Sequence, residues 1–174
     1  SRSAEGPGPL PDGQTDPPFN VEAECAVLGA CMHNSDIIDA VRPILGDAAF
    51  YRPAHETIWR ALLSQRREDK PTDPIALTEL LQGQGDLQRV GGNTYVFQLA
   101  NVHYGTGGAE HHAEIIREKA NLRRLLASAI RTVQRAQEPG ADPEAIRSEV
   151  EAEMRAERER ALASGQGRLN RFAR

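Results

Sequence analysis

The sequence predicts an all-α protein: a compact bundle of about five short helices, followed by a long antiparallel helical hairpin. Apolar residues recur at intervals of three and four, the spacing of one helix face, through most of the chain after its first 18 residues. Asp73-Pro74 and Asp142-Pro143 each place an N-capping side chain before a proline at the first helical position. No segment shows a convincing strand pattern.

Composition limits the classes of function. The 174 residues suffice for one domain with tails, and the net charge of −4 argues against a nucleic-acid binder that uses its whole surface. No apolar run reaches the roughly 18–20 residues of a membrane span, so we expect a cytoplasmic protein without a membrane partner. The two cysteines, Cys25 and Cys31, follow no zinc pattern and point about 120° apart on a helix, so we expect free thiols.

Residues 1–18 hold five prolines and three glycines, and we expect them to form a disordered lead. A globular domain is predicted over 19–107. Its first helix, in "VEAECAVLGACMH", has an apolar stripe, and Gly29 would allow close packing. The stripe consists of Val21, Val27, Leu28 and Cys31. In the second helix, "SDIIDAVRPIL", Ser35 is the expected N-cap, and Pro43 should kink or shorten the helix.

The third helix should begin at Pro53. The apolar side chains that it should turn inward are Ile58, Trp59, Leu62 and Leu63. The fourth is capped by Asp73, and Gly83 or Gly85 supplies its left-handed terminal residue.

The fifth helix is expected in "NTYVFQLANV", although the β-branched Val90, Thr94 and Val96 leave a strand possible there. The preceding Gly91 and Gly92 could be read as a phosphate-binding loop. A P-loop requires Gly-Lys, however, and the chain has no such dipeptide, which favours a loop that starts a helix.

The hairpin is predicted over 108–160. Apolar residues on its first arm follow heptad-like steps. They are Ile115, Leu122, Leu126, Ala129, Val133 and Ala136. The first arm is basic and the second, which should extend to about residue 160, is acidic, so the two arms should pair side by side. Residues 161–174 are predicted to form a basic linker or tail.

The sequence offers no catalytic constellation. The one cluster of histidines and acids lacks the H-E-x-x-H spacing of a zinc site, and we expect no metal, cofactor or catalytic residue. Its members are His103, Glu110, His111, His112 and Glu114. His55 is expected to serve in capping or packing. Arginines of the first arm and the tail could contact phosphates, with pairing inside the hairpin and a solvated tail as the alternatives. The candidates are Arg123, Arg124, Arg131, Arg168 and Arg171.

Four collinear blocks between about Pro17 and Leu126 carry a family resemblance. They are "PPFNVEAECAVLGACM", "FYRPAHETIW", "PTDPIALTELLQGQGDLQRVGGNTYVFQL" and "AEIIREKANLRRLL". Through them the chain resembles the N-terminal domain of DnaB-type replicative DNA helicases. The P-loop of that family's ATPase domain does not occur in these 174 residues.

The resemblance implies a collar domain that is not itself an enzyme, within a protein that would be an ATP-dependent 5′–3′ helicase. Hairpins of two subunits would pair, and three dimers would form a hexamer that docks primase or a helicase loader. ATP and magnesium would bind a separate motor domain, and DNA would be reached through the ring. Self-association would involve Leu122, Leu126, Ala129 and Val133. The alternative is a stand-alone relative that regulates a helicase or binds DNA through its basic arm and tail.

Overall fold

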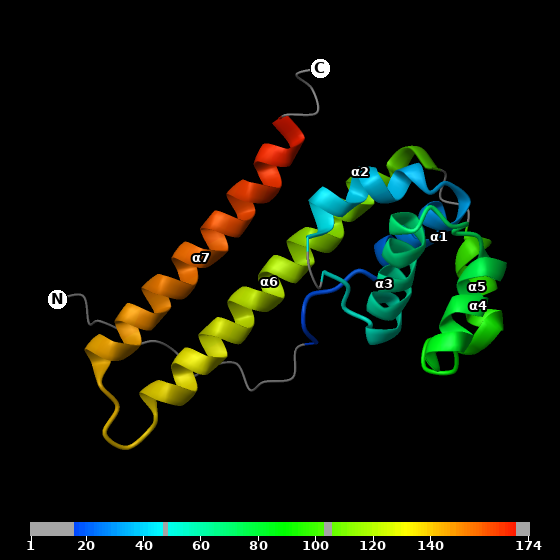
Figure 1. The fold of residues 1–174 in the computed structure, drawn as a ribbon. Coiled ribbons are helices and arrows are strands. Elements are labelled where there is room, and N and C mark those ends of the chain that lie inside the picture. Colours follow the sequence, from blue (N-terminus) through cyan, green and yellow to red (C-terminus); the bar gives the residue numbers. More distant parts are fainter. Residues whose placement is uncertain (1–15, 47–48, 103–105, 170–174) are drawn as a thin grey trace.

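The computed structural model describes residues 16–46, 49–102 and 106–169, with the backbone alone for 106 and 164–169. Within these ranges it contains seven α-helices, one short 3-10 helix and no strand, which confirms the predicted all-α class (Figure 1). Five short helices precede the hairpin: α1 (Val21–His33), α2 (Asp36–Leu45), α3 (Pro53–Arg67), α4 (Pro74–Gln84) and α5 (Gly92–Ala100). The 3-10 turn Thr106–Gly108 leads into α6 (Ala109–Ala136), and α7 (Pro143–Leu169) returns beside it.

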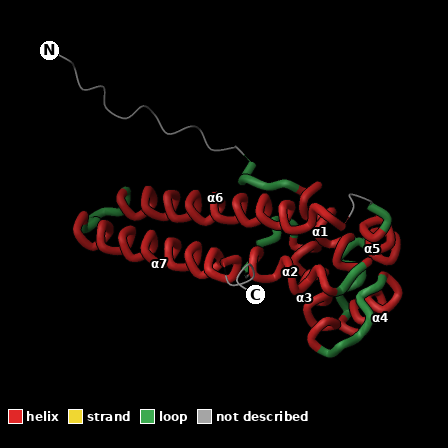
Figure 2. Tube along the Cα trace, turned by 90° about the horizontal axis from the view of Figure 1, so that it is seen from above, coloured by secondary structure: helices red, strands yellow, loops and turns green. Residues whose placement is uncertain are grey.

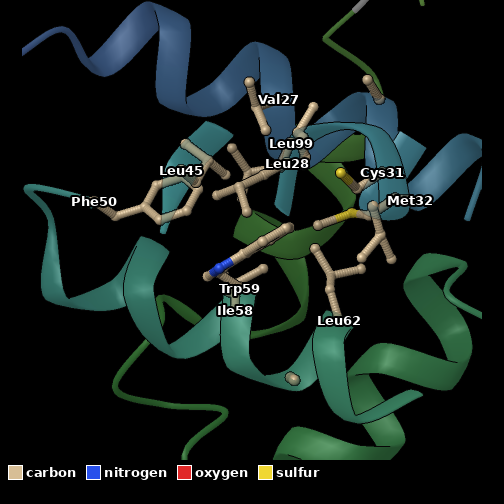
Figure 3. Packing of buried hydrophobic residues seen from close by; sticks show 14 of the residues in the cluster. Val27, Leu28, Cys31, Met32, Leu45, Phe50, Ile58, Trp59, Leu62 and Leu99 are labelled. Atoms are coloured by element: carbon tan, nitrogen blue, oxygen red, sulfur yellow. The ribbon is translucent and has the colours of Figure 1, made fainter. Parts of the chain in front are cut away.

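Helix α1 lies at the centre of the bundle. It contacts α2, α3, α5 and α6, and its residues from Ala26 to Met32 are all buried. Val27, Leu28 and Cys31 of the expected stripe are buried, and so are residues on the other sides of α1, because neighbouring helices cover it almost all round. Figure 3 shows Leu28 and Cys31 of α1 packed with Trp59 and Leu62 of α3 in this core.

Close approach of α1 and α5 depends on Gly29. A Cβ atom at this position would lie 2.5 Å from the carbonyl oxygen of Leu99, well inside van der Waals contact. The expectation that this glycine allows close packing is confirmed.

Local signals set most helix ends. The Asp73 carboxylate accepts hydrogen bonds from the backbone N–H groups of Ile75 (2.9 Å) and Ala76 (3.2 Å), as expected for an N-cap. Gly85, with φ of 76°, supplies the left-handed residue after α4.

The start of α2 differs from the expectation. Ser35 makes no side-chain capping bond; instead, Asn34 Oδ1 accepts from the Asp36 N–H (2.9 Å), and the Ser35 hydroxyl accepts from Arg66 (3.1 Å). Tertiary contact with α3 has thus drawn the serine away from the helix end. Pro43 lies in the last turn of α2, which ends at Leu45.

The glycine pair before α5 starts a helix. Gly91 and Gly92 have φ values of 109° and 75°, which other residues rarely adopt, and α5 begins at Gly92. Val96 lies in this helix and is buried, so the strand that we left open is not formed.

Helices α6 and α7 form the predicted antiparallel hairpin (Figure 2). The opposite charges of the arms meet: Arg131 lies 3.1 Å from Glu153, and Arg135 pairs with Glu149. Helix α7 continues to Leu169, and its expected end near residue 160 is wrong. This helix packs against α2 as well as α6, and it continues through Gly165 and Gly167 despite their low helix propensity.

Most of the expected disordered lead, residues 1–15, lies outside the described residues, as do residues 170–174. Among the described helices, none is both long and apolar enough to cross a membrane.

Candidate functional site

Among the side chains that the structure describes, the largest group of exposed apolar ones on one helix lies on α6. Leu122, Leu125, Leu126 and Ile130 keep 42%, 42%, 41% and 48% of their surfaces exposed. Exposed Ala129 and half-buried Val133 continue this face. We call these six residues the α6 apolar face.

The α6 apolar face points away from α7. The residues of α6 that meet α7 include Ser128, Arg131 and Arg135, which contact Glu153 or Glu149. At 3.6 residues per turn these three are centred about 160° around the helix from the line through Leu122 and Val133. The intramolecular partner therefore leaves the apolar face uncovered.

The other buried residues of α6 lie on the side of the globular bundle. Ala109, Ala113, Ile116 and Ala120 are at most 4% exposed and join the core that includes α1 and α2. The first half of α6 is thus anchored on the bundle, whereas its second half projects with α7 (Figure 2).

The predicted self-association residues Leu122, Leu126, Ala129 and Val133 all lie on the α6 apolar face. Leu125 and Ile130, which the heptad pattern did not include, widen it. No charged residue occupies this face between Leu122 and Val133. Ala136 is the last residue of the predicted heptad-like pattern. It lines a hollow with Ile146 and Val150 of α7, so the α6 apolar face ends before it.

Arg123, a candidate phosphate contact, is bound within the fold. Its guanidinium donates to the carbonyl oxygens of Pro18 and Ala49, both at 2.7 Å, and lies 5.4 Å from the centre of the Tyr51 ring. Tyr51 in turn stacks on Phe19 at 4.6 Å between ring centres. Burial lowers the pKa of Arg123 from its ordinary value. This side chain fastens the segment before α1 and the segment before α3 to α6.

The other candidate phosphate contacts are held within the hairpin or lie outside the described residues. Arg131 pairs with Glu153 at 3.1 Å, and Arg124 donates to Asn121 Oδ1 at 2.7 Å. The side chain of Arg168 and all of Arg171 lie outside the described part of the chain. Arg124 and Arg131 line one hollow between the hairpin arms, and Glu153 and Glu157 line the same hollow, so its surface is of mixed charge.

The sequence did not indicate that Glu24, His55 and Tyr95 form one buried network. Glu24 is 2% exposed and His55 is fully buried, and His55 Nδ1 lies 2.6 Å from Glu24 Oε2. His55 Nε2 lies 2.5 Å from the Tyr95 hydroxyl, and the Tyr51 N–H donates to Glu24 Oε1 at 2.5 Å. The network joins α1, α3 and α5. Glu24, His55 and Tyr95 all belong to the sequence blocks that carry the family resemblance. That shared membership was the one feature of the sequence that could have pointed to the network.

The surroundings of His55 raise its pKa above the ordinary value. Burial lowers the pKa of the imidazole, but hydrogen bonds to Cys25 and Glu24 outweigh burial, so the net pKa is raised. Cys25 Sγ lies 4.0 Å from His55 Nε2. Both cysteines are free thiols, and burial raises the pKa of Cys31 to about 12. Within the helical core this acid–histidine pair connects α1 to α3.

No group of three or more histidines, cysteines or acids in the described residues is arranged to hold a metal ion. His111 and His112 of α6 have ring centres 6.1 Å apart. His103, the third histidine of the predicted cluster, lies outside the described residues.

Comparison with known proteins relates the chain to replicative helicases. Residues 16–118 match the family described as "DnaB-like helicase N terminal domain". A "Replicative DNA helicase DnaB" of Rhodothermus marinus is 36% identical over 138 residues, which are 79% of this chain and 15% of the relative. The protein of the same description from Mycobacterium leprae is 35% identical over 126 residues, 72% of this chain and 21% of the relative.

A third such protein, from Haemophilus influenzae, is 32% identical over 155 residues, 88% of this chain and 33% of the relative. The chain thus spans between 15% and 33% of the length of these relatives. The fold is also similar to a solved structure, the "N-terminal domain of DnaB helicase from Mycobacterium tuberculosis". The TM-score is 0.76 at 31% identity, over 82% of this chain and 99% of that one.

Proposed function

Because the chain belongs to the DnaB-like helicase N-terminal domain family, we propose that it is a non-catalytic assembly module of a replicative DNA helicase. In this role it pairs with a second copy through the α6 apolar face and contributes to a hexameric collar. The collar docks a primase or a helicase loader, whereas ATP hydrolysis and DNA translocation belong to a separate motor domain.

The observation that carries this proposal is the uncovered α6 apolar face. Four large side chains there remain between 41% and 48% exposed, although α6 already packs on the bundle and on α7. Contiguous exposed apolar residues mark interaction sites more often than ordinary surface. Covering the rest of each of these side chains would contribute on the order of 1 kcal/mol.

A second copy of the chain suits this face. Its six residues are all apolar, and Arg123, Arg124 and Arg131 lie outside it, so the face can pair with an identical face. Two-fold pairing of identical surfaces is the commonest arrangement in homo-oligomers. In a two-fold dimer each leucine is buried twice, once from each copy, so its free-energy contribution is doubled. The summed contributions must exceed an association cost of roughly 4–15 kcal/mol.

Exposed apolar side chains at the end of the bundle far from the hairpin support the docking of a partner protein there. Ile75 of α4 and Phe97 of α5 are 67% and 41% exposed, and Figure 1 shows α4 and α5 at the end of the molecule farthest from α7. A dimer formed through α6 leaves these helices accessible to another protein.

Light scattering on the purified chain tests the pairing. We expect the wild-type mass to rise toward a dimer with micromolar concentration, and Leu126→Asp to hold the chain as a monomer. Ile75→Asp is the matched control, because it also places a charge on an exposed apolar site but outside α6, and it should dimerise like the wild type. A wild-type chain that stays monomeric at high micromolar concentration would contradict the proposal.

A further inference from the structure

The loop before α1 runs along the edge of the α6 apolar face. Arg123 of α6 donates to the carbonyl oxygen of Pro18 at 2.7 Å, and Figure 2 shows this loop alongside α6. Arg123 stands three and seven positions before Leu126 and Ile130, so it lies on the flank of the face that these two residues form. The residues that precede Asp16 are therefore attached to the bundle directly beside the exposed face.

An aromatic pair borders the same flank of α6. The Phe19 side chain is exposed and stacks on Tyr51 at 4.6 Å between ring centres. The Arg123 guanidinium lies 5.4 Å from the centre of the Tyr51 ring. Apolar surfaces edged by aromatic rings are the kind of surface on which proline-rich segments dock.

The sequence before Asp16 contains one such proline-rich segment. Residues 7–11 read "PGPLP", and Leu10 is the one large apolar residue in residues 1–15. These residues lie outside the described part of the chain. Prolines restrict the backbone before binding, so a segment of this composition loses little conformational freedom when it docks.

The length of the chain allows this segment to reach the whole face. Eight residues lead from Leu10 to Pro18, and an extended chain of that length spans up to roughly 26 Å. Leu122 and Val133, which delimit the face, are separated by roughly 16 Å of helix. Leu10 can therefore meet any part of the α6 apolar face of its own molecule.

We propose that residues 7–11 lie across the α6 apolar face, with Leu10 against Leu126 and Ile130, and that they compete with a second copy of the chain for this face. The segment is then an autoinhibitory cover, and its release exposes the face for assembly. The competition rests on the pairing proposed above, whereas the contact within one molecule does not.

The cover should bind more weakly than a second copy. A single leucine of the segment meets the face, whereas a second copy brings the four large side chains of its own face. A cover that occupies the face half of the time weakens dimerisation about fourfold, because each of the two copies must release its own segment.

Photo-crosslinking at submicromolar concentration tests the contact by itself. The full chain with p-benzoylphenylalanine in place of Leu10 should form a crosslink within one molecule to α6 peptides that contain Leu126 or Ile130. The yield should fall several-fold in Leu126→Asp and stay unchanged in Ile75→Asp, the matched exposed apolar site outside α6. No crosslink to α6, or equal yields in the two variants, would overturn the proposal.

Light scattering on the full chain measures the competition. Leu10→Ser should dimerise about fourfold more tightly than the wild type, and Ala4→Ser, which leaves "PGPLP" intact, should dimerise like the wild type. Equal dimerisation of Leu10→Ser and the wild type would overturn the competition. If neither chain dimerises at high micromolar concentration, the pairing proposed above fails, and the crosslink alone supports or overturns the contact.

Discussion

His55 Nδ1 and Glu24 Oε2 lie 2.6 Å apart in the core, where both side chains are almost wholly buried. The pair links α3 to α1, and Tyr95 extends it to α5. A carboxylate and an imidazole in such a place stabilise the fold only while each satisfies the other. The same pair therefore makes the bundle sensitive to substitution and to pH.

Glu24→Ala should lower the free energy of unfolding by about 3–5 kcal/mol, because it leaves His55 and the Tyr51 N–H buried without their acceptor. Urea denaturation monitored by circular dichroism measures the loss. Glu22→Ala, in the same helical turn but exposed, should change stability by less than about 0.5 kcal/mol. Equal effects of the two substitutions would show that the buried pair contributes nothing.

Stability should fall as pH rises through the raised pKa of His55. The pKa of His55 is raised in the folded state, so the folded chain holds this proton more tightly than the unfolded chain does. The resulting stabilisation is complete below the unfolded pKa of about 6.5 and is lost as pH rises through the folded pKa. The midpoint of urea denaturation, measured from pH 5 to pH 9, reports this loss of stability. His55→Gln should flatten the profile and His111→Gln should retain it; a wild-type midpoint that rises over this range would contradict the assignment.

Gly29→Ala should destabilise the bundle by about 1–3 kcal/mol, because the new Cβ would lie 2.5 Å from the Leu99 carbonyl and force α1 from α5. Gly83→Ala is the matched control. Gly83 lies within α4, and a Cβ atom added there would meet no atom within 4 Å, so alanine should stabilise the chain by about 0.5–1 kcal/mol. Thermal unfolding distinguishes the opposite signs, and a neutral Gly29→Ala would mean that the helices can separate at no cost.

Arg123→Gln should lower the unfolding free energy by about 2 kcal/mol, since it removes the donor to the Pro18 and Ala49 carbonyls. Limited proteolysis should also cut faster near residue 18. Arg89→Gln, at a largely exposed site, should leave both measurements unchanged. If Arg123→Gln instead weakened binding to single-stranded DNA without altering stability, its role as a phosphate contact would be restored.

The helices themselves were largely predictable, because their signals are local. The Asp73 cap, a terminal glycine at Gly83 or Gly85, and a helix start at Gly91 and Gly92 were predicted from the residues at each helix end. The opposite charges of the hairpin arms predicted their pairing, which Arg131 and Glu153 show. Errors arose where tertiary contacts prevailed over local preference, as at Ser35, whose hydroxyl bonds to α3, and at the end of α7 beside α2.

Periodicity along α6 was enough to reveal a line of apolar residues, because that pattern depends only on the rise and twist of one helix. It could not reveal that α7 covers the opposite side, which leaves Leu122 and Leu126 exposed. Nor could it distinguish Arg123, bound to two carbonyls, from Arg124, which lines a hollow with α7. These distinctions depend on which segments distant in the sequence pack together, and packing among several helices is a property of the folded chain alone.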